Sequence, residues 1–136
     1  MNTMNTLPRI GFMLGDVTGI GPEIAAKLLA SGKPAACAQT VIIGDRRVLE
    51  LGMRNANVKF AYSVCKSIDD IQWPRKDYPL IDLGDTDPAK YPQGVSSDEA
   101  GKLAGDTLKV MIDLALAEDL GDAGDVTTLA IIPAQT

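Results

Sequence analysis

The hydrophobic positions of this chain fall into short continuous runs separated by stretches with helical spacing. Apolar runs of strand length cover residues 9–14, 39–43, 78–83 and 126–132, while residues 57–62 alternate between apolar and polar as an edge strand does. Apolar residues three and four positions apart predict helices over residues 22–31, over 46–52 and from Ser96 or Ser97 to Gly121. Continuous β-branched runs are typical of strands that helices cover on both faces. The pattern therefore predicts an α/β fold with a mostly parallel sheet and helices on both faces.

The residues outside these elements are expected to form one tail and several loops. Residues 1–8 are polar and end in a proline, so we expect a flexible tail followed by a single α/β domain over 9–136. Residues 31–34 predict a turn, and residues 67–79 and 84–93 are polar and irregular. The last of these loops carries several aspartates, but it lacks the spacing of a calcium-binding loop.

A glycine-rich turn links the first predicted strand to the first predicted helix. Residues 15–23 read Gly-Asp-Val-Thr-Gly-Ile-Gly-Pro-Glu, and Pro22 suits the first helical position because its missing N–H costs nothing there. The glycines let another group approach the main chain, and the free N–H groups that open this helix can hold an anion or the polar edge of a ligand. The simpler interpretation is that the glycines make a tight strand-to-helix crossover that Asp16 closes.

The glycine spacing argues against two common phosphate-binding motifs. No Gly-Lys-Ser/Thr follows, as a P-loop requires, and glycines at positions 15, 19 and 21 do not fit the Gly-x-Gly-x-x-Gly dinucleotide pattern. A second strand–Gly–Asp–helix step ends at Asp45, which we interpret as a helix N-cap rather than a ligand. In the last helix, Gly101 and Gly105 place small residues on one face, which could pack within the domain or contact another subunit; the sequence leaves both open.

Composition and charge exclude several classes of function. The 136 residues are 46% hydrophobic and 23% charged, as in ordinary globular domains. A net charge of −5 argues against a nucleic-acid partner or an anionic membrane, and no apolar run approaches the ~20 residues that cross a bilayer. Cys37 and Cys65 are far apart and have no metal-binding or redox spacing, so we expect buried free thiols of a cytoplasmic protein. The chain has no histidine, which excludes histidine acid–base catalysis and imidazole metal ligands within it.

Residues 15–24, which read Gly-Asp-Val-Thr-Gly-Ile-Gly-Pro-Glu-Ile, resemble the N-terminal Gly-Asp-Pro-Ala-Gly-Ile-Gly-Pro-Glu motif of the 4-hydroxythreonine-4-phosphate dehydrogenase family. Residues 94–101 are similar to a Gly-x-x-Ser-x-x-x-Gly helix of that family. Pro133 fits the start of its Pro-x-(Asn/His)-Lys segment, although no lysine follows. The resemblance implies the first domain of an isocitrate/isopropylmalate dehydrogenase-like fold, truncated relative to longer family members.

For function, the resemblance implies an NAD(P)-dependent dehydrogenase that also uses a divalent metal (Zn, Mg, Mn or Co). Family members oxidise 4-(phosphooxy)-L-threonine and then release CO₂, on the route to pyridoxal phosphate. The Val-Thr pair in place of Pro-Ala keeps a threonate or erythronate phosphate as an alternative substrate. The family's three histidine metal ligands lie beyond this sequence, so no catalytic or metal-binding residue is expected here.

The cofactor-facing positions that the resemblance implies are Asp16, Gly19, Ile20 and Gly21. It also implies a homodimer that acts on a small phosphorylated molecule. The other interpretation is a catalytically inactive α/β fragment that only binds nucleotide or associates with itself.

Overall fold

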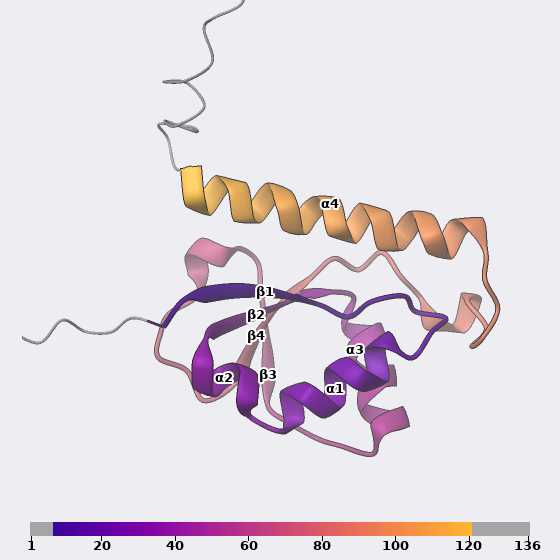
Figure 1. The fold of residues 1–136 in the computed structure, drawn as a ribbon, viewed down its shortest axis with the longest axis horizontal. Helices are drawn as coiled ribbons and strands as arrows, with labels where there is room; N and C mark the ends of the chain where they lie inside the picture. The colour runs from indigo at the N-terminus through magenta and orange to yellow at the C-terminus, as the bar shows by residue number, and fades with distance from the viewer. Residues whose placement is uncertain (1–6, 121–136) are drawn as a thin grey trace, which may run out of the picture.

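The computed structural model describes residues 7–120, which form a parallel four-stranded sheet between two helical layers (Figure 1). The strands are β1 (Arg9–Met13), β2 (Gln39–Gly44), β3 (Tyr62–Cys65) and β4 (Tyr78–Asp82), in the order β1-β2-β4-β3. The helices are α1 (Gly21–Ala30), α2 (Lys33–Cys37), α3 (Arg46–Ala56) and α4 (Asp98–Leu120), with 3-10 turns η1 (Ile68–Asp70) and η2 (Pro88–Lys90). The first three helices lie on one face of the sheet and α4 lies across the other (Figure 1). The predicted α/β class and parallel sheet are confirmed.

The order of the strands follows from where each connection runs. β1 pairs in parallel with β2, with Gly11 opposite Val41, and the two are joined through α1 and α2. From β2 the chain passes through α3 to β3 at the far edge, and it then returns to β4, which pairs with both β2 and β3. This return places the carboxyl ends of β1, β2 and β4 next to one another at one edge of the sheet.

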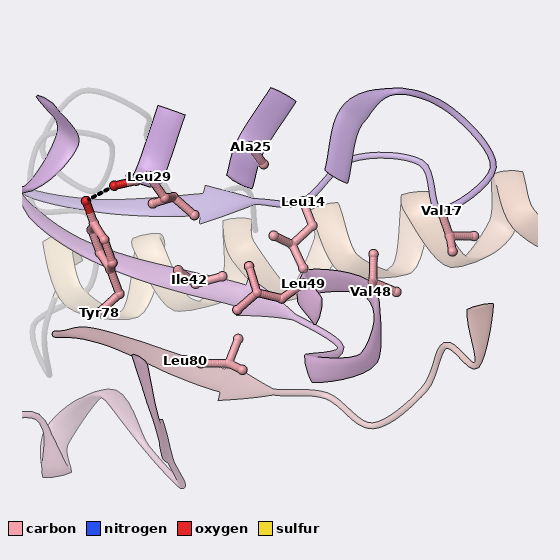
Figure 2. Close-up of a cluster of buried hydrophobic side chains, with 9 residues drawn as sticks. All are labelled: Leu14, Val17, Ala25, Leu29, Ile42, Val48, Leu49, Tyr78 and Leu80. Atoms are coloured by element: carbon pink, nitrogen blue, oxygen red, sulfur yellow. Dashed lines mark hydrogen bonds between the residues drawn. The ribbon is translucent and has the colours of Figure 1, made fainter. Parts of the chain in front are cut away.

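The core has one layer on each face of the sheet. On the α1 and α3 side, a cluster of nine buried side chains fills the space (Figure 2): Leu14, Val17, Ala25, Leu29, Ile42, Val48, Leu49, Tyr78 and Leu80. On the opposite side, Val110, Met111 and Leu114 of α4 pack against the second cluster, which contains Val41 and Ile43. The side chains of successive β2 residues thus point into the two core layers on opposite faces of the sheet. Because both faces are buried, the sequence of β2 is continuously apolar.

The hydroxyl of Tyr78 makes a buried hydrogen bond whose loss can be measured. It donates to the main-chain carbonyl of Leu29 over 2.7 Å (Figure 2). Tyr78→Phe keeps the ring but removes this donor, so we expect the free energy of unfolding in urea to fall by about 1 kcal/mol. Tyr91→Phe is the matched control, because within residues 7–120 the Tyr91 hydroxyl has no hydrogen-bond partner. Equal effects of the two changes would contradict the assignment.

Two boundaries around α3 differ from the prediction. The predicted helix over 46–52 is too short, because the helix continues to Ala56 and Gly52 is a packing position within it. Asn57 then caps α3 in the left-handed conformation, with φ of 52°. The predicted strand over 57–62 is therefore wrong in its bounds, since the residues before Tyr62 leave the helix and only then enter β3. The prediction that this strand lies at an edge is confirmed.

The turn predicted over 31–34 is only partly correct. Gly32 follows α1 with a φ of +73°, which suits a glycine just past a helix end. The residues after it do not continue as a turn, because Lys33–Cys37 form α2, with Pro34 in its first turn. Cys37 at the end of α2 is exposed, so the expectation of a buried thiol is wrong there. The predicted strand over 126–132, the residues after Leu120 and most of the expected tail lie outside the described residues.

The last helix begins as predicted. The Ser97 hydroxyl accepts a hydrogen bond from the N–H of Ala100 over 3.1 Å, as an N-cap does. Asp98 and Glu99 occupy the first turn, where carboxylates are favourable. No helix within residues 7–120 is long and apolar enough to cross a membrane.

Candidate functional site

Three loops meet at the carboxyl edge of the sheet. The glycine turn follows β1, Asp45 follows β2, and the segment 83–87 follows β4. In open parallel sheets this edge is where ligands bind. A cavity of about 30 Å³ lies between these loops and α4, and it is lined in part by Gly15, Asp45, Thr86 and Ala104. A cavity of this size has room for water but not for a substrate, so a larger ligand could bind only outside it.

The glycine turn is packed closely upon itself. Gly15 has a φ of +80°, and a Cβ added at Gly15 would lie 3.2 Å from the Cα of Gly21. A Cβ added at Gly21 would lie 3.0 Å from the carbonyl oxygen of Leu14. Gly19 is different, because a Cβ there would come no nearer than 3.7 Å to the atoms around it. Two glycines are therefore required by the turn itself, whereas the shape of the turn does not require Gly19.

Asp16 closes this turn, as the simpler interpretation proposes. Its Oδ1 accepts hydrogen bonds from the N–H and the hydroxyl of Thr18, both over 2.9 Å. Its main-chain carbonyl accepts the N–H of Gly19 over 3.1 Å. These hydrogen bonds join the start of the loop to its later residues and hold it in a closed turn.

The structure brings the four predicted cofactor-facing residues together. Asp16, Gly19 and Ile20 are exposed in the loop between β1 and α1, and Gly21, the first residue of α1, is half-buried. None of the four lines the small cavity beneath α4. Ile20 is 70% exposed, the highest value among the exposed large apolar residues of the described chain. The turn thus presents a glycine, an apolar side chain and a carboxylate outward at the amino end of α1.

A second, unpredicted cluster centres on Asp45. Its Oδ1 accepts from the N–H of Arg47 over 2.8 Å, which confirms the predicted N-cap. Its Oδ2 also accepts the N–H of Thr86 over 2.8 Å and the Nη2 of Arg47 over 2.9 Å. Burial would raise the pKa of the Asp45 carboxyl, but the hydrogen bonds from Arg47 and Thr86 outweigh burial and lower the pKa below its usual range. Asp45 therefore stays ionised and ties the end of β2 to the loop after β4.

The same edge carries an exposed guanidinium beside several carboxylates. The side chain of Arg47 is 45% exposed and its Nη1 lies 3.8 Å from Asp87 Oδ2. Asp82 at the end of β4 accepts the N–H groups of Arg46 and Gly84 over 3.0 and 3.1 Å. The repeated strand–Gly–Asp–helix step could have pointed to Asp45 in the sequence. It could not have pointed to Thr86, which lies 41 positions further along the chain.

The part of the chain that the structure describes does not fit a resident metal ion. Within residues 7–120, no group of three cysteine, aspartate or glutamate side chains is arranged to hold one. The complete sequence has no histidine.

A larger pocket, of about 690 Å³, lies near Met53 and Phe60 before the start of β3, away from the carboxyl edge.

Comparisons with known proteins agree with this architecture. A provisionally named D-threonate 4-phosphate dehydrogenase of Symbiobacterium thermophilum is 34% identical over 113 residues, which are 83% of this chain and 34% of that protein. The crystal structure of a 4-hydroxythreonine-4-phosphate dehydrogenase from Burkholderia phymatum superposes with a TM-score of 0.74 at 28% identity, covering 84% of this chain and 34% of that one. The chain belongs to the 4-hydroxythreonine-4-phosphate dehydrogenase family.

The match to this family is confined to one segment. A provisionally named second 4-hydroxythreonine-4-phosphate dehydrogenase of Pseudomonas aeruginosa is 30% identical over 112 residues, covering 80% of this chain and 32% of that protein. The chain thus spans about a third of the length of the relatives it matches. No family model matches the chain. The family resemblance carried by the glycine turn is confirmed, while the predicted roles of its residues stay predictions.

Proposed function

We propose that this chain forms part of the nucleotide-facing wall of an NAD- or NADP-dependent dehydrogenase. The observation that carries the proposal is the outward face of the glycine turn. Asp16 holds the turn rigid, Gly19 leaves the main chain open to a ligand, and Ile20 offers an apolar surface next to the amino end of α1. A rigid loop at the carboxyl edge of a parallel sheet suits a dinucleotide, because the loop loses little conformational freedom on binding.

In this proposal the described residues bind and orient, and they carry out no chemical step. The nicotinamide would accept hydride from the substrate. Gly19 and the main chain of the turn would allow close approach of the cofactor, while Ile20 would exclude water from its apolar face. A divalent metal, if the complete enzyme uses one, would need ligands from outside residues 7–120.

The proposed substrate is a phosphorylated hydroxy acid. One relative is named for 4-hydroxythreonine 4-phosphate and another for D-threonate 4-phosphate. Both names describe a short hydroxylated acid with a terminal phosphate. The first would place the chain in an enzyme of pyridoxal phosphate synthesis, and the second in an enzyme of sugar-acid metabolism.

The test is nucleotide binding by the 136-residue chain, measured by isothermal titration calorimetry with NAD⁺ and NADP⁺. Gly19→Val is expected to lower the affinity at least about tenfold, because the added side chain occupies the space that the cofactor would approach. Ala30→Val is the control, since it adds similar bulk at the exposed far end of α1. Unchanged affinity in Gly19→Val would reject the site, and no binding of either nucleotide to the unaltered chain would reject the proposal.

A further inference from the structure

The pocket at the end of α3 lies at the edge of the sheet where the strands begin, opposite the edge that carries the glycine turn. All of its lining comes from residues 50–62, which form the second half of α3 and the chain that leads into β3. Its volume of about 690 Å³ lies within the range of about 300–1,000 Å³ that is typical of small-molecule sites. We call it the α3 pocket; its half-buried apolar lining is Met53, Val58 and Phe60, and its exposed cations are Arg54 and Lys59.

The shape of the α3 pocket follows from the way α3 ends. Asn57 has a φ of 52°, and a left-handed residue at this place turns the chain away from the helix axis. The N–H of Val58 then donates to the carbonyl of Met53 over 3.0 Å, which holds the departing chain beside the last turns of the helix. Glu50, Met53 and Asn57 are three and four positions apart, so they share one face of α3. The pocket therefore lies between this helix face and the chain that follows it.

The apolar lining is supported from the core side. The ring of Phe60 meets the ring of Tyr78 edge to face, with centroids 5.5 Å apart and planes at 82°. Tyr78 is itself held by the hydrogen bond from its hydroxyl to Leu29, and Met53 packs against the same buried cluster. A lining that is already ordered loses little conformational freedom when a ligand binds.

The charged groups around the pocket favour an anion. Arg54 and Lys59 are exposed, and within residues 7–120 the side chain of neither takes part in a hydrogen bond or an ion pair. Glu50 is the acidic residue of the lining, and it is already engaged. Its Oε1 accepts the hydroxyl of Tyr62 over 2.7 Å and lies 3.7 Å from Nε of Arg46.

Two opposing effects leave the pocket positive. Burial and the hydrogen bond to Glu50 raise the pKa of Tyr62 to about 12, so this hydroxyl still donates to Glu50 at neutral pH. The main-chain carbonyls at the end of α3 contribute a partial charge of about −0.5, which is smaller than the full charges of Arg54 and Lys59 together. This local positive charge contrasts with the net charge of −5 of the whole chain.

We propose that the α3 pocket binds a small organic anion that has an apolar body and one carboxylate. The body lies against Met53, Val58 and Phe60, and the carboxylate accepts hydrogen bonds from Arg54 and Lys59. A guanidinium suits this role, because its planar donors match both oxygens of a carboxylate. This binding does not depend on a nucleotide at the glycine turn.

The first test separates the body of the ligand from its charge. The probe is naphthoate, titrated into the isotope-labelled 136-residue chain and followed by amide correlation NMR. Naphthamide keeps the rings without the charge, and acetate keeps the carboxylate without the rings. We expect naphthoate to shift the amide signals of residues 50–62 and to bind at least about fivefold more tightly than either control probe. Equal affinity for naphthamide or acetate, shifts confined to other residues, or no binding of naphthoate would overturn the proposal.

The second test places the carboxylate at the two cations. The double variant Arg54→Gln with Lys59→Gln removes both charges, so the dissociation constant of naphthoate is expected to rise at least about fivefold while that of naphthamide stays unchanged. Lys66→Gln with Lys102→Gln is the matched control, because it changes the net charge equally at two exposed positions outside the pocket. If both double variants weaken naphthoate equally, the net charge of the protein attracts the probe and the proposal is wrong. Circular dichroism of each variant checks that the helix content is unchanged.

Discussion

Gly52→Ala is expected to lower the free energy of unfolding by about 3 kcal/mol, although alanine is the better helix former. Gly52 lies in the middle of α3, where this helix crosses α1. A Cβ added there would lie 2.2 Å from the carbonyl oxygen of Pro22 and 2.6 Å from its carbonyl carbon. These are main-chain atoms of α1, so no side-chain rotation can relieve the contact, and the two helices must move apart.

The measurement is urea unfolding followed by far-UV circular dichroism. Asn55→Ala is the control, because Asn55 is an exposed position of the same helix and its replacement is expected to change stability by no more than about 0.5 kcal/mol. Because Pro22 adjoins the glycine turn, Gly52→Ala should also weaken any nucleotide binding there. A variant as stable as the control would show that α1 and α3 can separate at no cost.

Gly52 also shows which parts of this fold a sequence reveals. Local signals predicted β1, β2, β4 and α4 well, because continuous apolar runs and a serine cap act over a few neighbouring residues. The same local reasoning placed the end of α3 at Gly52, four residues before its actual end at Ala56. The actual reason for the glycine is a helix 30 residues earlier in the chain, at Pro22, and no local pattern contains that information.

Some features of the candidate site could likewise be predicted from the sequence, and others could not. The glycine turn and the cap at Asp45 could be predicted, because each is a short motif with a local hydrogen-bonding reason. The bond from Thr86 to Asp45 could not, since it depends on β4 lying beside β2 in the sheet. The strand order itself was not predictable from the pattern, because β3 and β4 occupy the sheet in the reverse of their order in the chain.

The bond between Asp45 and Thr86 leads to the second large expected effect. Asp45→Asn is expected to lower the free energy of unfolding at neutral pH by about 2–3 kcal/mol. The amide keeps one acceptor oxygen but turns an N–H₂ group toward Arg47 and the N–H of Thr86, where the carboxylate accepts hydrogen bonds. The loop after β4 would lose its fixed attachment to β2. Asp69→Asn, at an exposed position in η1, is the control and should change stability little.

The pH dependence of this effect separates the charge of Asp45 from its shape. The folded-state pKa of Asp45 lies below its ordinary value of 3.8, so the unfolded chain binds this proton more readily than the folded one. The stabilisation is therefore complete at neutral pH and is lost as the pH falls below about 4 and passes through the folded-state pKa.

Asp77 also has a lowered pKa, because Arg75 donates hydrogen bonds to it, so the unaltered chain alone does not isolate Asp45. The quantity to measure is the difference in unfolding free energy between the unaltered chain and Asp45→Asn, at about pH 7 and at about pH 3. Asp77 contributes equally to both proteins and cancels from this difference. We expect the difference to shrink at the lower pH, because there the unfolded chain binds the Asp45 proton that the folded chain, with its lowered pKa, binds less readily. A difference that is the same at both pH values would show that shape, and not the charge held between Arg47 and Thr86, accounts for the role of Asp45.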